Sequence, residues 1–284
     1  MFEKFARSWQ LIKASAEVLR QDKELLVFPA ISALAALLVM ATFILPLFGL
    51  LDFKAIEADD GSVLPWMVIW AFLFYMSQYF VIFFFNTALV GAAMIRLEGG
   101  DPTVADGFRI ARGKIGVILG YAAIAATVGM VLRLIEQRAG FIGTWIAGLI
   151  GAAWTVVTFL TVPVLVMRDV GPIEAVKESA KLLKQTWGEN VIGQGGVGLV
   201  FGLAQVLVMV SIGALAIFCL ANRQVAAGVV VGSVGIILML LIALLQAALS
   251  GIYSAALYRH AAGLPNGGGF DPGMLALAFA PKKK

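Results

Sequence analysis

The sequence is poor in the side chains that carry most enzyme chemistry. It contains one cysteine, Cys219, and one histidine, His260, among 284 residues. A single cysteine excludes an intrachain disulfide and any metal site with several cysteine ligands. One histidine cannot form a histidine-rich metal site, and no nucleophile–base–acid constellation is evident. We therefore predict no catalytic residue, no metal and no cofactor, and expect a protein that is not an enzyme.

Charge is also scarce, and it is absent from the interior of six long apolar runs. Charged residues make up 13% of the chain, against about 25% in a soluble domain. The runs cover 25–51, 63–95, 115–132, 141–167, 191–221 and 225–258. About 20 helical residues cross the hydrocarbon layer, and the third run reaches that length if it extends through Arg133 to Ile135 with the Arg133 side chain snorkelling. The pattern predicts an all-α membrane protein with six transmembrane helices, forming one polytopic domain over 1–284.

Lys and Arg residues alternate in number along the segments that flank these runs. The first, third, fifth and last segments carry five, four, four and four of the 21 basic residues, and the segments between them carry one, two and one. Cytoplasmic loops of membrane proteins collect Lys and Arg, so both termini are expected in the cytoplasm. This bias also accounts for the basic pI, so no nucleic-acid partner is expected. The mixed charge before residue 25 and the length of the first run predict no cleavable signal.

An amphipathic stretch precedes each odd-numbered run, with apolar residues spaced three and four apart. This spacing predicts helices that lie in the headgroup layer, and Asp101 is expected to cap the second. The simplest arrangement is three units, each an interfacial helix and a transmembrane hairpin, over 1–95, 96–167 and 168–260, with a cytoplasmic tail over 261–284. Whether these units are true repeats stays open. The three apolar stripes are Phe2, Phe5, Trp9, Ile12, Ala16 and Leu19; Val104, Phe108, Ala111 and Ile115; and Ile173, Val176, Ala180, Leu183 and Trp187.

Three groups of residues are candidates for specific contacts. Lys177, Lys181 and Lys184 share the polar face of the third stretch and, with Trp187, form a candidate surface for lipid or a partner; the alternative is that this helix only braces the bundle. Amides within the runs either join helices or line a polar path. Small residues four apart allow helices to pack closely, inside the chain or in a homo-oligomer. The amides are Gln78, Asn86, Gln205 and Gln246, and the glycine pairs are Gly116/Gly120, Gly198/Gly202 and Gly228/Gly232.

A glycine-rich sequence at 193–198 matches G-x-G-x-x-G but opens an apolar run. A dinucleotide site needs a preceding strand, so helix packing explains it better. Ionisable residues are missing from deep within every run, which argues against a proton- or ion-coupled carrier.

Four short blocks resemble a known family. They are DKELLVFP at 22–29, GGDPT at 99–103, VGPIEAVKES at 170–179 and TWGEN at 186–190. Together they resemble the uncharacterised bacterial and archaeal integral membrane proteins catalogued as domain of unknown function 6159. The resemblance implies a six-span protein of the prokaryotic cytoplasmic (inner) membrane, and it supplies no activity or catalytic residues.

Two functions fit these observations. The first is a non-enzymatic scaffold, accessory or assembly subunit that uses its cytoplasmic amphipathic helices. The alternative is a channel or carrier for a lipid or a small apolar solute. The expected partners are membrane lipids, together with a protein partner or a second copy of the chain.

Overall fold

The computed structural model describes residues 2–50, 65–138, 140–187, 196–265, 267 and 270, without the side chains of 2–11, 48–50, 65, 141–142, 185–187 and 196–200. The described part is helical, without a strand. Six of its helical segments are long and apolar enough to cross a membrane, which confirms the prediction of an all-helical chain with six such helices. The spans are α2 (Val27–Leu50), α4 (Pro65–Leu97), α6 (Ile115–Arg138), α7 (Gly140–Val157) with α8 (Thr161–Met167), α10 (Gly196–Ala221) and α11 (Val225–Ala261).

Shorter helices precede the odd-numbered spans. They are α1 (Phe2–Gln21) with the 3₁₀ turn η1 (Lys23–Leu26), α5 (Val104–Gly113) and α9 (Pro172–Trp187). Helix α5 begins with a capping box: the Thr103 hydroxyl accepts from the Asp106 N–H at 3.2 Å, and the Asp106 carboxylate accepts from the Thr103 N–H at 3.0 Å. The prediction that Asp101 caps this helix is therefore wrong. Thr103 is adjacent to the first helical residue, where its hydroxyl reaches the free amides.

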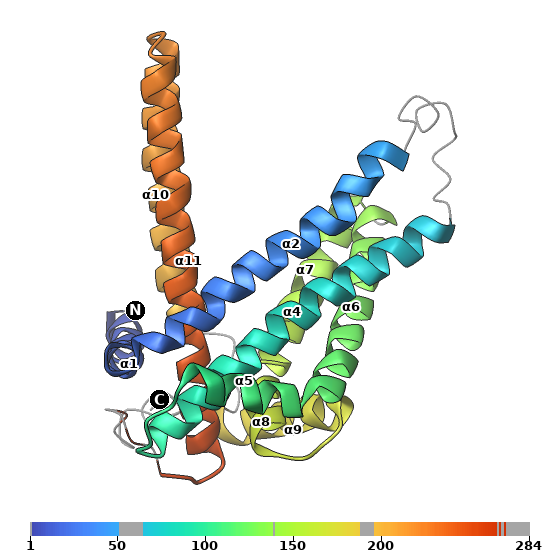
Figure 1. Cartoon of the computed structure of the whole chain (residues 1–284), viewed down its shortest axis with the longest axis vertical. Coiled ribbons are helices and arrows are strands. Elements are labelled where there is room, and N and C mark those ends of the chain that lie inside the picture. Colours follow the sequence, from blue (N-terminus) through green and yellow to red (C-terminus); the bar gives the residue numbers. More distant parts are fainter. Residues whose placement is uncertain are drawn as a thin grey trace.

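The short helices gather at one end of the molecule, where α4 and α11 also meet (Figure 1). We call this the basic end, because Arg96, Lys114, Arg168 and Arg259 lie there. Helix α4 is central and contacts α2, α6, α8 and α11. The main core is near the basic end, where small residues of α4 face small residues of α11. Those residues include Ala88, Ala92 and Ala93 in α4 and Ala248, Gly251, Ala255 and Ala256 in α11.

Away from the basic end the spans separate. The hairpin of α10 and α11 rises on one side, and α2 and α4 lean away on the other (Figure 1). Apolar side chains on these separated halves are exposed, and hydrocarbon is the solvent that suits such surface. Examples are Leu34, Leu38 and Leu45 in α2, Leu207 and Ile217 in α10, and Val229 and Ile236 in α11.

The fourth span is broken, which the continuous apolar run at 141–167 did not predict. Helix α7 ends at Val157 and α8 begins at Thr161, with turns between them. Pro163 explains the break, because proline lacks an N–H and its ring clashes with the carbonyl four residues earlier. Ser179 of α9 satisfies the freed backbone: its hydroxyl donates to the Val157 carbonyl at 2.6 Å and accepts from the Leu160 N–H at 3.1 Å. The signal for the break was a proline within the run.

The third span does extend past Arg133, as expected, and its helix continues to Arg138. The guanidinium carbon of Arg133 lies 5.4 Å from the centre of the Tyr75 ring, so α4 provides an aromatic contact for this charge. The division into three repeated units stays a prediction. Residues 188–195, which include the first half of the glycine-rich sequence, and most of the tail lie outside the described residues.

Candidate functional site

A cavity of about 330 Å³ lies where α2, α4, α6, the turn between α7 and α8, and α11 come together. Its described lining mixes apolar side chains with hydroxyls and one amide, without a charged side chain. The polar residues are Ser32, Asn86, Tyr121, Thr155, Thr158, Ser250 and Ser254. A polar cavity at a break in a spanning helix is the setting in which membrane proteins tolerate irregular backbone.

Exposure of the lining residues shows where the cavity opens. On α4, Leu89 is buried and lies nearer the basic end, whereas Ile82 is exposed. On α11, Ser254 is buried and Ala247 is exposed in the same order. On both helices the buried lining residue lies nearer the basic end and the exposed one lies farther from it. The cavity is therefore closed at the basic end, and its mouth lies where the spans separate. The cavity thus opens into the region that lipid would occupy.

The cavity lies deep along its helices. Asn86 is eleven residues from the end of α4 at Leu97, and Ser250 is eleven residues from the end of α11 at Ala261. Eleven helical residues span about 16 Å, and half of the hydrocarbon layer is about 15 Å thick. Helix α4 is tilted relative to α11 (Figure 1). The depth of Asn86 below the headgroups is therefore smaller than the length of helix that separates it from the end of α4.

Asn86 carries the one side-chain amide of the described lining and, like the hydroxyls of Ser32 and Ser250, lacks a hydrogen-bond partner there. Its side chain is half-buried and makes no hydrogen bond to any described residue. By contrast, the hydroxyls of Thr155, Thr158 and Ser254 donate to carbonyls of their own chain segments at 2.8–2.9 Å. A side-chain amide has two N–H donors and an acceptor oxygen. Asn86 therefore presents unused donors and an unused acceptor to the cavity.

The other three candidate amides join helices to one another. Gln78 of α4 donates to the Ala36 carbonyl of α2 at 3.0 Å. Gln205 of α10 donates to the Gln246 side-chain oxygen of α11 at 3.4 Å. The structure thus places Gln78, Gln205 and Gln246 between paired spans and Asn86 alone in the cavity.

The lysine face of α9 is exposed. Lys177, Lys181 and Lys184 are all solvent-accessible and make no ion pair within the described part of the chain; the Trp187 side chain lies outside the described residues. The buried side of α9 carries Ala175, Ser179, Leu182 and Leu183, while Ile173 is exposed. The packed face is thus rotated from the predicted stripe, because Ser179 has to face the break in the fourth span.

The glycine pairs pack less than the spacing predicted. A Cβ added at Gly120 would lie 3.0 Å from Pro172, and one at Gly228 would lie 3.0 Å from Leu220. At Gly116, Gly202 and Gly232 it would meet no atom of the described residues within 4 Å, so these three do not pack closely inside the described part of the chain, and the homo-oligomer contact stays a prediction. Spacing identifies small residues on one helix face but not whether another helix covers that face. Gly198 lies outside the residues with described surroundings.

The closest approaches occur at other glycines. At Gly107 of α5 an added Cβ would lie 2.5 Å from the Phe28 ring and 2.7 Å from the Ala88 carbonyl oxygen. At Gly251 of α11 it would lie 2.5 Å from Leu89, beside the cavity. Neither belongs to a G-x-x-x-G pair, so only the tertiary contacts identify them.

Ion pairs connect the segments at the basic end. Arg96 of α4 pairs with Asp22, which precedes η1, through two guanidinium nitrogens and also contacts Asp101 at 2.6 Å. The blocks at 22–29 and 99–103 are therefore joined by one arginine. Near α5, hydrogen bonds from Thr103 and the charge of Arg109 lower the pKa of Asp106.

A second group of contacts holds α8 and α9. Arg168 pairs with Glu178 at 3.0 Å and donates to the Tyr258 hydroxyl of α11 at 3.3 Å. The hydrogen bond to Tyr258 is the main cause that raises the pKa of Arg168. Lys114, just before α6, contacts Asp169 at 3.3 Å.

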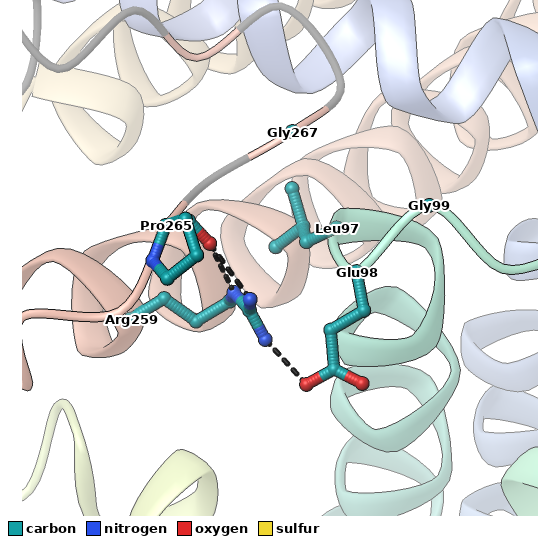
Figure 2. A pocket seen from close by; sticks show the side chains of 6 residues that line it. All are labelled: Leu97, Glu98, Gly99, Arg259, Pro265 and Gly267. Carbon is teal, nitrogen blue, oxygen red and sulfur yellow. Dashed lines mark hydrogen bonds and ion pairs between the residues drawn. The ribbon is translucent and has the colours of Figure 1, made fainter.

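A larger cavity, of about 520 Å³, lies at the basic end beside Arg259 (Figure 2). The Arg259 side chain is 5% exposed and pairs with Glu98 at 2.5 Å, across 161 residues of sequence. Its other nitrogens donate to the Pro265 carbonyl at 2.7 and 3.1 Å. Figure 2 shows the guanidinium pointing between these two partners rather than into the open space. The residues therefore clamp α4 to α11, and sequence reasoning missed this pair because no local pattern links them.

The comparisons with known proteins identify one family. The model of a family described as "Family of unknown function (DUF6159)" matches residues 64–268, which is most of the chain. Three of the four blocks quoted above fall inside this range, whereas the block at 22–29 precedes it. No curated protein matches the chain.

Proposed function

The chain belongs to the DUF6159 family of unknown function, and we propose that it is a non-enzymatic carrier that binds a lipid or a small apolar solute in the cavity around Asn86. One observation carries the proposal: an amide without a hydrogen-bond partner among the described residues faces a cavity that opens sideways towards lipid. An unpaired amide in apolar surroundings costs free energy. A ligand that enters from the membrane and supplies the missing hydrogen bonds recovers that cost.

The broken fourth span supports a carrier rather than a simple bundle. The lining of the cavity includes Thr158 and Phe159, which lie in the turn between α7 and α8. Transporters often form their binding sites from such discontinuous helices near the bilayer interior. The sequence-based alternative of a lipid or apolar-solute carrier is thus the function that the geometry supports best.

We further propose that the protein lies in a prokaryotic cytoplasmic membrane with both termini in the cytoplasm. The support is the uneven distribution of Lys and Arg among the flanking segments. A reporter that is active only outside the cytoplasm tests this. Fused after Lys284 it should be silent, and inserted beside Arg223, between α10 and α11, it should be active. The opposite pair of results would reverse the orientation.

A scaffold or accessory role is the second candidate, and the lysine face of α9 favours it. Three exposed lysines on one helix at the basic end form a surface that suits anionic headgroups or an acidic partner. This role and a ligand-binding cavity are compatible, because the three lysines lie on the exposed face of α9 and do not line the cavity.

The carrier proposal is tested by the lipids that remain with the purified protein. Wild type, Asn86→Leu and Gln78→Leu are extracted into lipid discs from mixed bilayers, and bound molecules are identified by native mass spectrometry. Gln78→Leu is the matched control, because it removes an amide two turns away on α4 that bonds to α2 rather than facing the cavity. We expect a bound amphiphile in wild type and Gln78→Leu that is lost from a stably folded Asn86→Leu. Equal retention in all three proteins would refute the proposal.

A further inference from the structure

We infer that the cavity around Asn86 selects an electrically neutral amphiphile, with a small head group that bears hydroxyl or carbonyl groups and a hydrocarbon tail, over anionic lipids. This inference rests on the proposed function and specifies its ligand. Four features of the structure support it: the uncharged lining, the engagement of the nearest cations, the size of the cavity and the direction of its mouth.

Among the described residues, no cation is available to an anionic head group at this depth. The lining contains no Lys, Arg or His. Arg96 follows Asn86 on α4 and is occupied by Asp22 and Asp101. Arg259 follows Ser250 on α11 and is occupied by Glu98 and the Pro265 carbonyl.

The cations on the opposite wall are engaged in the same way. Arg168, which follows α8, pairs with Glu178, and Lys114, which precedes α6, pairs with Asp169. A phosphate in the cavity would lie in low-dielectric surroundings without a counter-charge, and such burial is strongly unfavourable. A neutral head group avoids this cost.

The cavity is large enough for a head group but not for a whole lipid. A volume of about 330 Å³ corresponds to about eleven water molecules at about 30 Å³ each. A hydrocarbon tail therefore has to leave through the mouth, past Ile82 and Ala247. Beyond the mouth lie the exposed apolar faces of α2 and α11, which suit an acyl or prenyl chain.

The polar groups of the cavity match an alcohol. The Asn86 amide offers two donors and one acceptor. The hydroxyls of Thr155 and Ser254 already donate to backbone carbonyls, so their oxygens remain acceptors. A ligand hydroxyl both donates and accepts, so it is able to bond to Asn86 and to one of these oxygens. A purely apolar molecule would leave Asn86 unsatisfied.

A matched pair of photoreactive probes tests the selectivity. Diacylglycerol and phosphatidate that carry the same diazirine near the glycerol end of one chain differ only by the phosphate. Each is titrated into lipid discs that contain the full-length protein, and the labelled peptides are mapped by mass spectrometry. We expect saturable diacylglycerol labelling on residues 82–89 and 247–254, and at least about tenfold weaker phosphatidate labelling there.

Variants locate the site and provide a control. Asn86→Leu should reduce diacylglycerol labelling of these residues several-fold, whereas Gln205→Leu, which removes an amide between α10 and α11, should leave it unchanged. Melting temperatures test whether both variants fold, and the selectivity of the wild type is measured without either variant. Equal or stronger phosphatidate labelling that depends on Asn86 would overturn the inference and leave the carrier proposal intact. If neither probe labels the cavity saturably, both proposals fail.

Discussion

Replacement of Ser179 by alanine should destabilise the protein by removing the group that repairs the broken fourth span. The Ser179 hydroxyl is buried and makes two hydrogen bonds, to the Val157 carbonyl at 2.6 Å and from the Leu160 N–H at 3.1 Å. Each buried hydrogen bond contributes about 1 kcal/mol, so Ser179→Ala should cost about 2 kcal/mol. For a chain of this size that corresponds to a fall of about 4–8 °C in the melting temperature.

The assay compares thermal unfolding of wild type, Ser179→Ala and Ser233→Ala in the same detergent. Ser233 is the matched control, because its exposed hydroxyl donates only to the Val229 carbonyl of its own helix at 2.9 Å. Ser233→Ala should therefore change the melting temperature by less than about 2 °C. Hydrogen exchange gives a local measure: amides at 158–161 should exchange faster in Ser179→Ala than in either other protein. Equal melting of the two variants, with unchanged exchange, would refute the role assigned to Ser179.

Three further predictions follow from contacts at other positions. Gly107→Ala should destabilise the protein by about 1–3 kcal/mol through overpacking, whereas Gly116→Ala, in open surroundings, should be neutral or stabilising by up to about 1 kcal/mol; equal effects on the melting temperature would contradict the packing. Gln205→Leu should lower the free energy of unfolding by less than about 1 kcal/mol, because hydrogen bonds between side-chain amides of membrane helices are weak. A larger loss would show that this hydrogen bond contributes more to stability than we expect. Hydrogen bonds from Thr103 lower the pKa of Asp106 below its usual 3.8. The ionised Asp106 carboxylate therefore stabilises the fold above pH 3.8, and this stabilisation is lost as the pH falls through the lowered pKa. The stability difference between wild type and Asp106→Asn should therefore shrink below about pH 4, and a difference that grows on acidification would reverse the sign.

The sequence-based predictions were most successful where a single segment determines the outcome. An apolar run has to be helical in a membrane, because its own backbone must satisfy every hydrogen bond. The positions of α4, α6 and α11 therefore follow the runs closely. The capping box of α5 is equally local, although the correct residue, Thr103, lies two positions after the predicted Asp101.

The predictions were weaker where the neighbours of a residue decide its role. Gln78 and Asn86 are both amides on α4, and nothing in their local sequence separates them. The structure gives Gln78 a carbonyl of α2 as its partner and places Asn86 in a cavity. Gly116 and Gly120 likewise share one motif, yet only Gly120 faces a neighbouring residue closely.

The sequence by itself determined the helical class, the six spans and the alternation of basic flanking segments, because helix rise, bilayer thickness and charge are properties of each segment alone. Only the tertiary structure decided which amide stays unpaired, which serine repairs a broken span and which arginine clamps α4 to α11. Arg259 and Glu98 are separated by 161 residues, and their pairing depends on how α4 and α11 cross at the basic end. Such contacts depend on the geometry of several helices at once, and no local periodicity encodes that geometry.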